Sequence, residues 1–520
     1  MQRRKEKSRT EYTVRNFEIG VISQVVNIVL SFVVRTIFVK NLQESYLGVN
    51  GLFTNILTIL SFAELGIGSA IIYSMYKPIA DNDQEKIKTL MNLYKVSYRI
   101  IGIFIAVCGV ALIPFLDVFI KNKPDIPESL VLIYLLFLSN TVLSYFWSYK
   151  KSIIIAVQKE YIINIYKILF YVIKSFLQIL VLILWKNFIL YLIVQLVCTF
   201  LENVCTSIQA NRMFSYLKDK NVKKINESDK NKIFKNVRAL TVYKFGSVIL
   251  NATDNIIISA IVGITAVGIL SNYNLIVTSL VAIISTALSG LTASIGNLNV
   301  TSTKENKEQI FYELFFILTW IYGFCSIGLI VLLSPFIELW IGSEYVMPFM
   351  SVLALVLHFY VNGVQFAGYT YRTTTGLFEK GKIAPIVAAI LNIVLSLVLG
   401  RYMGVAGILF ATSISRLLTT TWIDPYLVHK YQFKTSVIKF YRRYVINFII
   451  VVVNCLACYV VTSMISNTVF GFILKVFILL LMANIIFLIA FYHSKEFKSV
   501  FLKIKNLFLN RFKILLSKIN

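Results

Sequence analysis

Charged side chains are scarce in this sequence, and acidic ones are the scarcest. Asp, Glu, Lys and Arg together make up 15% of the 520 residues, whereas 58% of the residues are hydrophobic. A soluble domain carries about 25% charged and about 45–50% apolar residues. A water-soluble core of this length cannot bury such an apolar surplus. The composition therefore excludes an ordinary soluble protein and predicts that lipid covers much of the chain.

The sequence also lacks the motifs of common catalytic sites. Its three histidines lie far apart, and no P-loop, GxSxG or HExxH pattern occurs. All six cysteines fall in apolar stretches, so no disulfide framework is expected. The pair Cys455 and Cys458 is interpreted as helix packing rather than as a metal or redox site. Because the predicted external loops are short, we expect no enzyme active site, no cofactor and no metal.

Apolar runs long enough to cross a bilayer recur along the whole chain. They predict an all-α membrane protein with about fourteen transmembrane helices, since a helix of about 20 apolar residues spans the hydrocarbon core. The predicted spans are 17–39, 50–73, 99–120, 130–149, 161–184, 187–209, 241–262, 266–295, 311–334, 349–371, 383–400, 403–427, 444–466 and 470–492.

The positions of the basic residues support this number of spans. If the N-terminus is cytoplasmic, forty of the 51 Lys and Arg residues fall in cytoplasmic segments and five in external segments. The remaining six lie within the spans. Cytoplasmic loops collect basic residues, so both termini are predicted to be cytoplasmic. This distribution explains most of the net charge of +26 without a ligand, and no nucleic-acid binding is expected.

A weak internal repeat divides the chain. Residues 151–159 align without gaps on residues 372–380, which pairs the fourth and fifth spans with the tenth and eleventh. Both copies start on the same side of the membrane, so the repeat is parallel and comprises six helices. The predicted parts are an N-terminal lobe (1–220), a C-terminal lobe (221–440), helices 13 and 14 (441–493) and a basic amphipathic tail helix (494–520). The tail helix is expected on the inner leaflet, or alternatively against cytoplasmic loops.

Several ionisable residues lie inside the predicted spans, where a charge is costly and usually faces a cavity or a partner. Lys167 and Lys174 are seven residues apart and share one helical face, which favours an anion site. Arg35 lies near the end of the first span, where snorkelling to the interface is the alternative. Asp254 and Glu64 are interpreted either as members of ion pairs or as coupling residues. The basic partners available to Asp254 are Lys244, Arg35 and Arg416.

One stretch of the sequence resembles a known family. Residues 45–80, SYLGVNGLFTNILTILSFAELGIGSAIIYSMYKPIA, are similar to the start of Wzx-type polysaccharide repeat-unit flippases, particularly those of Gram-positive bacteria. The run FAELGIGSA, followed by a Tyr-x-x-Tyr-Lys-Pro turn, is the most specific part. The segments RTIFVKNL and GVAGILFATSISR also fit. These flippases belong to the multidrug/oligosaccharidyl-lipid/polysaccharide exporter (MOP) superfamily. The resemblance implies two six-helix bundles around a central cavity with two additional C-terminal helices, in agreement with the repeat.

The resemblance also implies a function. The chain would move an undecaprenyl-diphosphate-linked oligosaccharide across the bacterial cytoplasmic membrane by alternating access, for a capsule, exopolysaccharide or teichoic-type polymer. Its partners would be this glycan, membrane lipid and a polymerase of the same pathway, and a monomer is expected. Cations expected at the diphosphate are Arg35, Lys167, Lys174, Lys244, Arg372 and Arg416. Residues expected to face sugars are Gln24, Asn27, Asn55, Asn140, Asn251, Asn272 and Tyr273.

Three alternatives stay open. A lipid II flippase shares the fold, but its first spans usually carry more arginines around a Gly-x-x-Arg pattern that this chain lacks. A multidrug antiporter of the same superfamily needs acidic cavity residues for cationic drugs, whereas the intramembrane charges here are mainly basic. A membrane glycosyltransferase or polymerase needs a large external loop, and none is predicted. A teichoic-acid repeat-unit flippase fits the sequence as well as a capsule flippase does.

Overall fold

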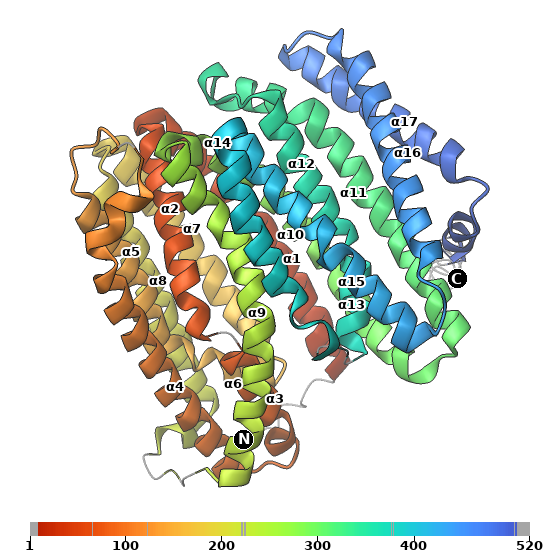
Figure 1. The fold of residues 1–520 in the computed structure, drawn as a ribbon. Coiled ribbons are helices and arrows are strands. Elements are labelled where there is room, and N and C mark those ends of the chain that lie inside the picture. The colour runs from red at the N-terminus through yellow and green to blue at the C-terminus, as the bar shows by residue number, and fades with distance from the viewer. Residues whose placement is uncertain are drawn as a thin grey trace, which may run out of the picture. The chain divides into compact units, whose positions relative to one another are not determined.

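The computed structural model describes residues 9–64, 66–121, 123–219, 222, 225–375, 377, 379–503 and 505–506. Within these residues every element of regular secondary structure is a helix and no strand occurs, which confirms the all-α prediction (Figure 1). The chain divides into two compact units, Met1–Thr286 and Ala287–Asn520. The boundary between these units lies inside a helix, and the predicted lobes 1–220 and 221–440 stay a prediction.

The first unit contains the helices from the N-terminus to most of α10. The long helices are α1 (Arg9–Asn41), α2 (Glu44–Leu60), α3 (Ile67–Ala80), α4 (Gln84–Ala111), α5 (Leu130–Ser148), α7 (Glu160–Leu184), α8 (Phe188–Met213), α9 (Glu227–Ile261) and α10 (Ile264–Thr301). The short ones are η1 (Ser61–Glu64), η2 (Ile113–Phe119), α6 (Lys151–Ala156) and η3 (Ser215–Lys218).

The second unit holds the remaining helices. They are α11 (Lys304–Ile341), η4 (Ser343–Tyr345), α12 (Phe349–Val364), α13 (Phe366–Thr374), η5 (Glu379–Gly381), α14 (Ala384–Leu418), α15 (Thr420–Val428), the π-helical turn η6 (His429–Phe433), α16 (Ile438–Ser463) and α17 (Val469–Phe491).

Eleven helical stretches of the described chain are long and apolar enough to cross a membrane. One of them, Ala384–Phe433, contains two predicted spans separated by a kink. The predicted second span is interrupted by η1, and the predicted seventh span lies in α9, whose apolar part Ala252–Ile261 is short. Because the divided stretch accounts for two predicted spans, the eleven stretches and these two further helices together correspond to all fourteen predicted spans.

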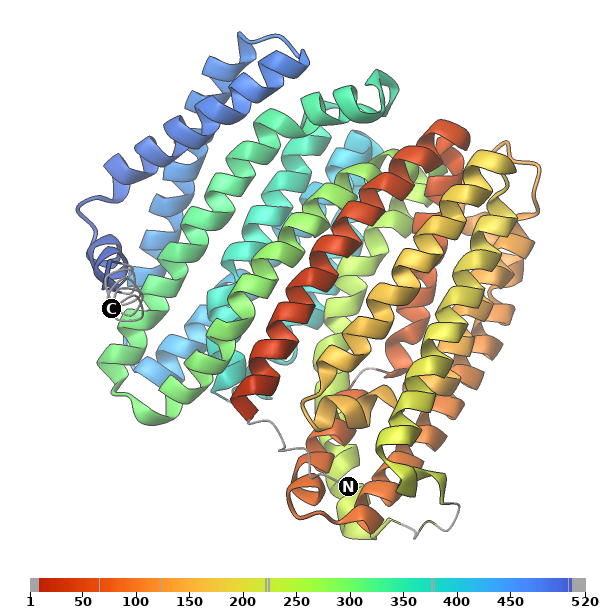
Figure 2. The ribbon, with the colours of Figure 1, turned by 180° about the vertical axis from the view of Figure 1, so that it is seen from behind.

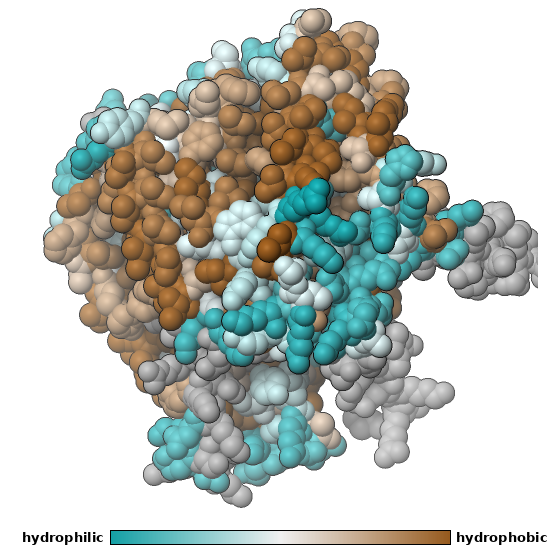
Figure 3. All heavy atoms as spheres, turned by 45° about the vertical axis from the view of Figure 1, so that its right-hand side comes forward, coloured by the Kyte–Doolittle hydropathy of each residue, from teal (hydrophilic) through white to brown (hydrophobic). Residues whose placement is uncertain are grey.

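Apolar side chains cover the outer faces of these helices, as lipid contact requires. In α17 only 22% of the most apolar window is buried, although its mean hydropathy is 2.8. Figure 3 shows a wide hydrophobic surface on the face that includes α16 and α17, with hydrophilic side chains gathered in a separate band. Helices that are this apolar and this exposed are expected in lipid, and the chain is a multi-pass membrane protein.

Packing in the first unit joins helices that are distant in sequence. The helix α1 lies along α7, and α8 packs against both α5 and α7 (Figure 2). Aromatic rings also join α1 to α8. Phe38 of α1 meets Phe188 and Tyr191 of α8 edge-on, with ring centroids 5.9 and 5.3 Å apart. The helix α2 packs against α9, and it also approaches the start of α10, where the carbonyl oxygen of Ile264 would lie 2.1 Å from a Cβ placed on Gly48. Only glycine permits this approach.

Packing in the second unit is centred on α11, which contacts α12, α16 and α17. The helix α14 is divided by Gly404, whose φ of 59° and ψ of −134° are non-helical. Close to this kink, a Cβ on Gly407 would lie 2.1 Å from the carbonyl oxygen of Leu399. The chain therefore turns within α14 because glycine supplies both a left-handed φ and a close backbone contact.

Candidate functional site

A small polar cavity lies within the first unit, among α1, α2, α7, α8 and α10. Its volume is about 140 Å³, and none of the residues that line it is acidic. Two of them, Arg35 and Lys174, belong to the six cations expected at the diphosphate. The complete lining is Ser31, Val34, Arg35, Phe38, Leu47, Asn50, Tyr171, Lys174, Ser175, Gln178, Tyr191, Gln195 and Leu275.

The guanidinium of Arg35 is held by polar atoms of α10. Its Nη1 donates to Ser271 Oγ at 2.7 Å and to Asn272 Oδ1 at 3.2 Å. Ser271 in turn donates to the carbonyl of Gly268 at 2.7 Å. These bonds keep the guanidinium at the cavity, so they favour the cavity role of Arg35 over snorkelling to the interface. Neutral partners leave the positive charge available to an anion.

The second cation, Lys174, points over an aromatic ring. Its Nζ lies 4.5 Å from the ring centroid of Tyr171, whose hydroxyl is 2.6 Å from Ser31 Oγ. Within the described residues no carboxylate oxygen lies within 4 Å of Lys174 Nζ. The acid Glu202 of α8 pairs instead with Lys151 at 2.8 Å. A cation–π contact stabilises the ammonium but does not neutralise it.

One polar group of the cavity wall has unused hydrogen-bonding capacity. Ser175 Oγ lines the cavity and is buried without a hydrogen-bond partner. Asn272 Nδ2, on the residue that holds Arg35, is also buried without a partner, but Asn272 does not line the cavity. Buried polar groups are usually satisfied, so each such atom calls for an explanation. Two cations and an unsatisfied hydroxyl around one space are the arrangement that an anion with several acceptor oxygens would complete.

Sequence reasoning missed part of this lining. Tyr171 and Gln178 lie one turn before and one turn after Lys174 on α7, and both face the cavity. The helical spacing that joined Lys167 to Lys174 carries the same signal and includes them. Lys167 itself is exposed and does not line the cavity.

The other residues expected to face substrate are not brought to this cavity. Gln24, Asn27, Asn55 and Asn140 are partly buried outside its lining, Tyr273 is fully buried, and Asp254 is partly buried in α9. In the second unit Arg416 is 7% exposed in α14. The side chains of Lys244 and Asn251 lie outside the described part of the chain. The substrate roles of all these residues stay predictions.

Arg372 forms a buried ion pair in the second unit. Its Nε lies 3.3 Å from Asp424 Oδ1, and the two side chains are 1% and 2% exposed. Its Nη1 donates to the carbonyl of Gly381 at 3.2 Å. A guanidinium this enclosed and this close to a carboxylate has an acidic structural partner. Among the described residues Arg35 and Lys174 have only neutral partners.

The aligned residue of the repeat, Lys151, forms the equivalent pair in the first unit. Lys151 and Arg372 follow the fourth and tenth predicted spans, and their partners Glu202 and Asp424 lie in the sixth and twelfth. The sequence alignment of 151–159 with 372–380 did not include the acidic partners. Their matching positions are therefore an independent observation in favour of the parallel repeat.

Glu64 lies where the second predicted span breaks. The chain leaves η1 through Gly66, whose φ is 92°. The carboxylate accepts a hydrogen bond from Tyr145 at 2.8 Å and another from Tyr98, which also accepts from Tyr94 at 2.9 Å. Discontinuous helices often supply functional groups in transporters. Tyrosine hydroxyls donate to Glu64, and among the described residues it forms no ion pair, so its predicted coupling role stays open.

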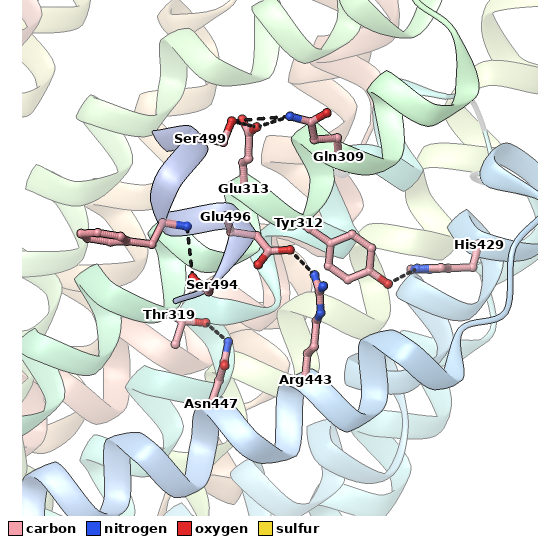
Figure 4. Close-up of polar contacts among 11 residues, drawn as sticks. Gln309, Tyr312, Glu313, Thr319, His429, Arg443, Asn447, Ser494, Glu496 and Ser499 are labelled. Atoms are coloured by element: carbon pink, nitrogen blue, oxygen red, sulfur yellow. Dashed lines mark hydrogen bonds and ion pairs between the residues drawn. The ribbon is translucent and has the colours of Figure 1, made fainter. Parts of the chain in front are cut away.

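The start of the tail contacts the second unit. Residues 495–503 are helical, and the ring of Phe497 stacks on Trp320 with a centroid distance of 6.1 Å. Figure 4 shows Glu313 of α11 accepting from Ser499 and Gln309, and Glu496 joined to Arg443 of α16. Lys503 also pairs with Glu313 at 2.5 Å. These contacts favour the alternative of a tail packed on the protein, and residues 507–520 lie outside the described part.

Comparisons of the fold identify relatives of known structure. The lipid II flippase MurJ in an inward closed conformation is similar over 92% of this chain and 98% of its own, with a TM-score of 0.64 and 15% identity. An inward-facing multidrug resistance MATE family transporter of the MOP superfamily is similar over 79% and 96%, with a TM-score of 0.60 and 14% identity. A MATE transporter of Vibrio cholerae is similar over 81% and 97%, with a TM-score of 0.54 and 11% identity.

These identities are low, so the likeness shows the fold that this chain shares with both kinds of transporter and no more. No curated protein sequence matches the chain significantly. Residues 13–293, more than half of the chain, match the family model described as polysaccharide biosynthesis protein. The match covers the segment 45–80 and every residue that lines the cavity of Arg35 and Lys174. The chain therefore belongs to the polysaccharide biosynthesis protein family.

Proposed function

We propose that this protein moves an undecaprenyl-diphosphate-linked oligosaccharide from the cytoplasmic to the outer leaflet, and that the cavity of Arg35 and Lys174 binds the diphosphate. One observation carries the proposal: both cations line a space whose lining contains no acid, and among the described residues no carboxylate oxygen lies within 4 Å of either cation. Such a cavity attracts a multiply charged anion, because charge-assisted hydrogen bonds are strong in a low-dielectric setting.

The size of the cavity limits what it holds. A volume of about 140 Å³ is below the roughly 300–1,000 Å³ that is usual for the pocket of a drug-sized ligand. The space is therefore suited to a phosphate group rather than to an oligosaccharide. The glycan would need a larger space, and the predicted central cavity between the lobes with its Asn and Gln side chains is our proposal for that role. The polyprenyl chain is proposed to lie along α16 and α17, whose outer faces are apolar.

The remaining features of the proposal follow the sequence. Alternating access of two six-helix lobes would expose the cavity to each leaflet in turn. The protein is proposed to lie in the bacterial cytoplasmic membrane with both termini inside, to act as a monomer and to supply a polymerase of the same pathway. This mechanism applies equally to the precursors of capsule, exopolysaccharide and teichoic-type polymers.

A lipid II flippase is the second candidate, since lipid II also carries a diphosphate and the fold resembles that of MurJ. A multidrug antiporter is less well supported, because cationic drugs need acidic residues and the cavity lining contains none. The identity of the lipid that accumulates when the protein is missing separates these three functions.

The test uses a deletion strain complemented with wild-type protein, Arg35→Ala, Lys174→Ala or the control Lys40→Ala. Lys40 is an exposed cation in the last turn of α1, so its removal matches the charge change outside the cavity. The measurements are surface polymer and the lipid-linked oligosaccharides accessible in right-side-out and inverted membranes. Loss of one charged hydrogen bond costs about 1.5–3 kcal/mol, so we expect each cavity variant to reduce export about tenfold or more, with Lys40→Ala unchanged.

Complete repeat units retained on the inner leaflet of the deletion strain would support the flippase. Accumulation of lipid II would favour the second candidate. Normal surface polymer together with altered sensitivity to cationic dyes would overturn the proposal and favour the antiporter.

A further inference from the structure

The first unit has two adjoining cavities at the end of the helices that carries its basic loops. Their volumes are about 530 and 410 Å³, and Lys95, Tyr149, Lys150 and Asn211 line both. Arg99, one turn from Lys95 on α4, lines the second cavity. We call Lys95, Arg99, Tyr149, Lys150 and Asn211 the basic site. None of these residues lines the cavity of Arg35 and Lys174.

We propose that the basic site binds the phosphate headgroup of an anionic, hydroxyl-bearing membrane phospholipid such as phosphatidylglycerol. This role is separate from transport of the lipid-linked glycan. The proposal rests on the charge of the site, on a buried polar atom and on the apolar surface that adjoins it.

The charge of the site is not neutralised by the protein. One acid, Asp219, lines the first cavity and pairs there with Lys88 at 2.9 Å, and Glu85 pairs with the same lysine at 2.5 Å. Among the described residues no carboxylate oxygen lies within 4 Å of the side-chain nitrogens of Lys95, Arg99 or Lys150. Burial and the neighbouring charge of Lys95 lower the pKa of Lys150, which follows α5. A phosphate placed among these three cations would relieve that repulsion.

A polar atom in the wall of the site has no partner in the protein. Asn211 Oδ1 is buried without a hydrogen-bond partner, and Asn211 lines both cavities. A carboxamide oxygen needs a donor, and a phosphate diester offers none. A glycerol hydroxyl on the same headgroup supplies the donor, so the wall is suited to a phosphate and a hydroxyl together.

The surface that adjoins the site is apolar. On α4 the side chains of Ile100, Ile103 and Val107 continue from Arg99 toward the other end of the helix and are 57–63% exposed. Ile208 of α8 lines the second cavity and is 45% exposed. Acyl chains attached to a headgroup in the site would lie along these residues. A soluble phosphate has no acyl chains to contact this surface, so the surface favours a lipid as the ligand.

Aromatic residues place this site at the membrane interface. Trp147 and Tyr149 at the end of α5 line the second cavity, and Trp147 contacts Phe200 edge-on at 5.0 Å. Trp and Tyr collect at the headgroup level of bilayers. Basic pockets between transmembrane helices on the cytoplasmic side are suited to anionic headgroups. The predicted topology assigns this end to the inner leaflet.

The test measures lipid binding to the purified full-length protein by native mass spectrometry, with phosphatidylglycerol and phosphatidylcholine as probes. The first variant is the double substitution Lys95→Gln with Lys150→Gln. The second is Asn211→Asp, which keeps the size of the side chain and adds a negative charge inside the site. The control is Lys40→Gln with Lys123→Gln, which removes the same charge from exposed positions elsewhere.

We expect both site variants to lower the bound fraction of phosphatidylglycerol at least fivefold relative to the control, with phosphatidylcholine unchanged. If the double variant does not elute as a folded monodisperse protein, Asn211→Asp decides the outcome. Equal phosphatidylglycerol binding by the site variants and the control would overturn the proposal. Displacement of the lipid by inorganic phosphate at the same concentration would also overturn it, because the site would then recognise a free anion.

Discussion

Single residues decide which of the buried charges in this protein serve structure and which are available to a ligand. Arg372 and Asp424 are enclosed together, and Lys151 and Glu202 form the same pair in the other half of the repeat with 23% and 20% exposure. Arg35, in contrast, is held by two neutral oxygen atoms. The type of partner, and not depth in the membrane alone, separates these two roles.

The enclosed pair makes a prediction about stability. Asp424→Asn removes the carboxylate that lies 3.3 Å from the buried guanidinium of Arg372, which we expect to lower the free energy of unfolding by about 3–5 kcal/mol. Thermal unfolding of the purified protein in detergent measures the effect. Replacing both partners, with Arg372→Met and Asp424→Leu, removes both charges and should cost clearly less. Glu202→Gln should lower the free energy of unfolding by less, because the Lys151–Glu202 pair is more exposed. Equal losses for the single and double variants would contradict this account.

At the scale of elements, two interruptions distinguish the helices of this protein from simple spans. The second predicted span is divided into α2, η1 and α3, and the stretch Ala384–Phe433 is divided into α14, α15 and η6. Backbone polar groups freed inside a membrane protein must be satisfied by other parts of the protein. Each interruption includes a glycine of positive φ, Gly66 and Gly404.

The kink in α14 makes a prediction about this element. Gly404→Ala places a Cβ at a φ of 59° and ψ of −134°, where an L-residue is strained. We expect a loss of about 1–3 kcal/mol, measured by thermal unfolding. The control is Gly328→Ala in α11, where a Cβ meets nothing within 4 Å. This control should be neutral or slightly stabilising. A loss of the same size at both positions would show that the kink imposes no special backbone requirement.

At the scale of the whole molecule, the predicted topology depends on the loops between the spans. The external loops are predicted to be short and poor in basic residues, and the loop that joins the sixth and seventh predicted spans is basic. The positive-inside rule then assigns the basic site to the inner leaflet. Both proposals, diphosphate transport and anionic lipid binding, depend on that orientation.

Single-cysteine labelling measures the orientation. Asp125→Cys lies in the loop before α5 and Asn226→Cys lies before α9, with three predicted spans between them. We expect a membrane-impermeant maleimide to label Asp125→Cys in right-side-out vesicles and Asn226→Cys in inverted vesicles. The unsubstituted protein, whose cysteines lie in apolar helices, provides the background. Labelling of both positions from one side would contradict an odd number of spans between them.

The sequence by itself determined the helical membrane architecture and the positions of its spans. A bilayer imposes a long apolar run on every span and favours basic residues on one side, and both signals are local in sequence. The segment 45–80 also indicated the family that the match over 13–293 establishes. The shared face of Lys167 and Lys174 is again a local property, since it follows from helical spacing.

Only the tertiary structure decided which charges meet. Arg35 is bound by Ser271 and Asn272, more than two hundred residues away, and no spacing rule links α1 to α10. Helical spacing placed Lys167 beside Lys174, but the packing of α7 leaves Lys167 outside the cavity. The sequence did not indicate the partner of Arg372 either, because Asp424 approaches Arg372 through the packing of α13 against α15. Periodicity fixes the face of a helix on which a side chain lies, whereas packing fixes what that face meets.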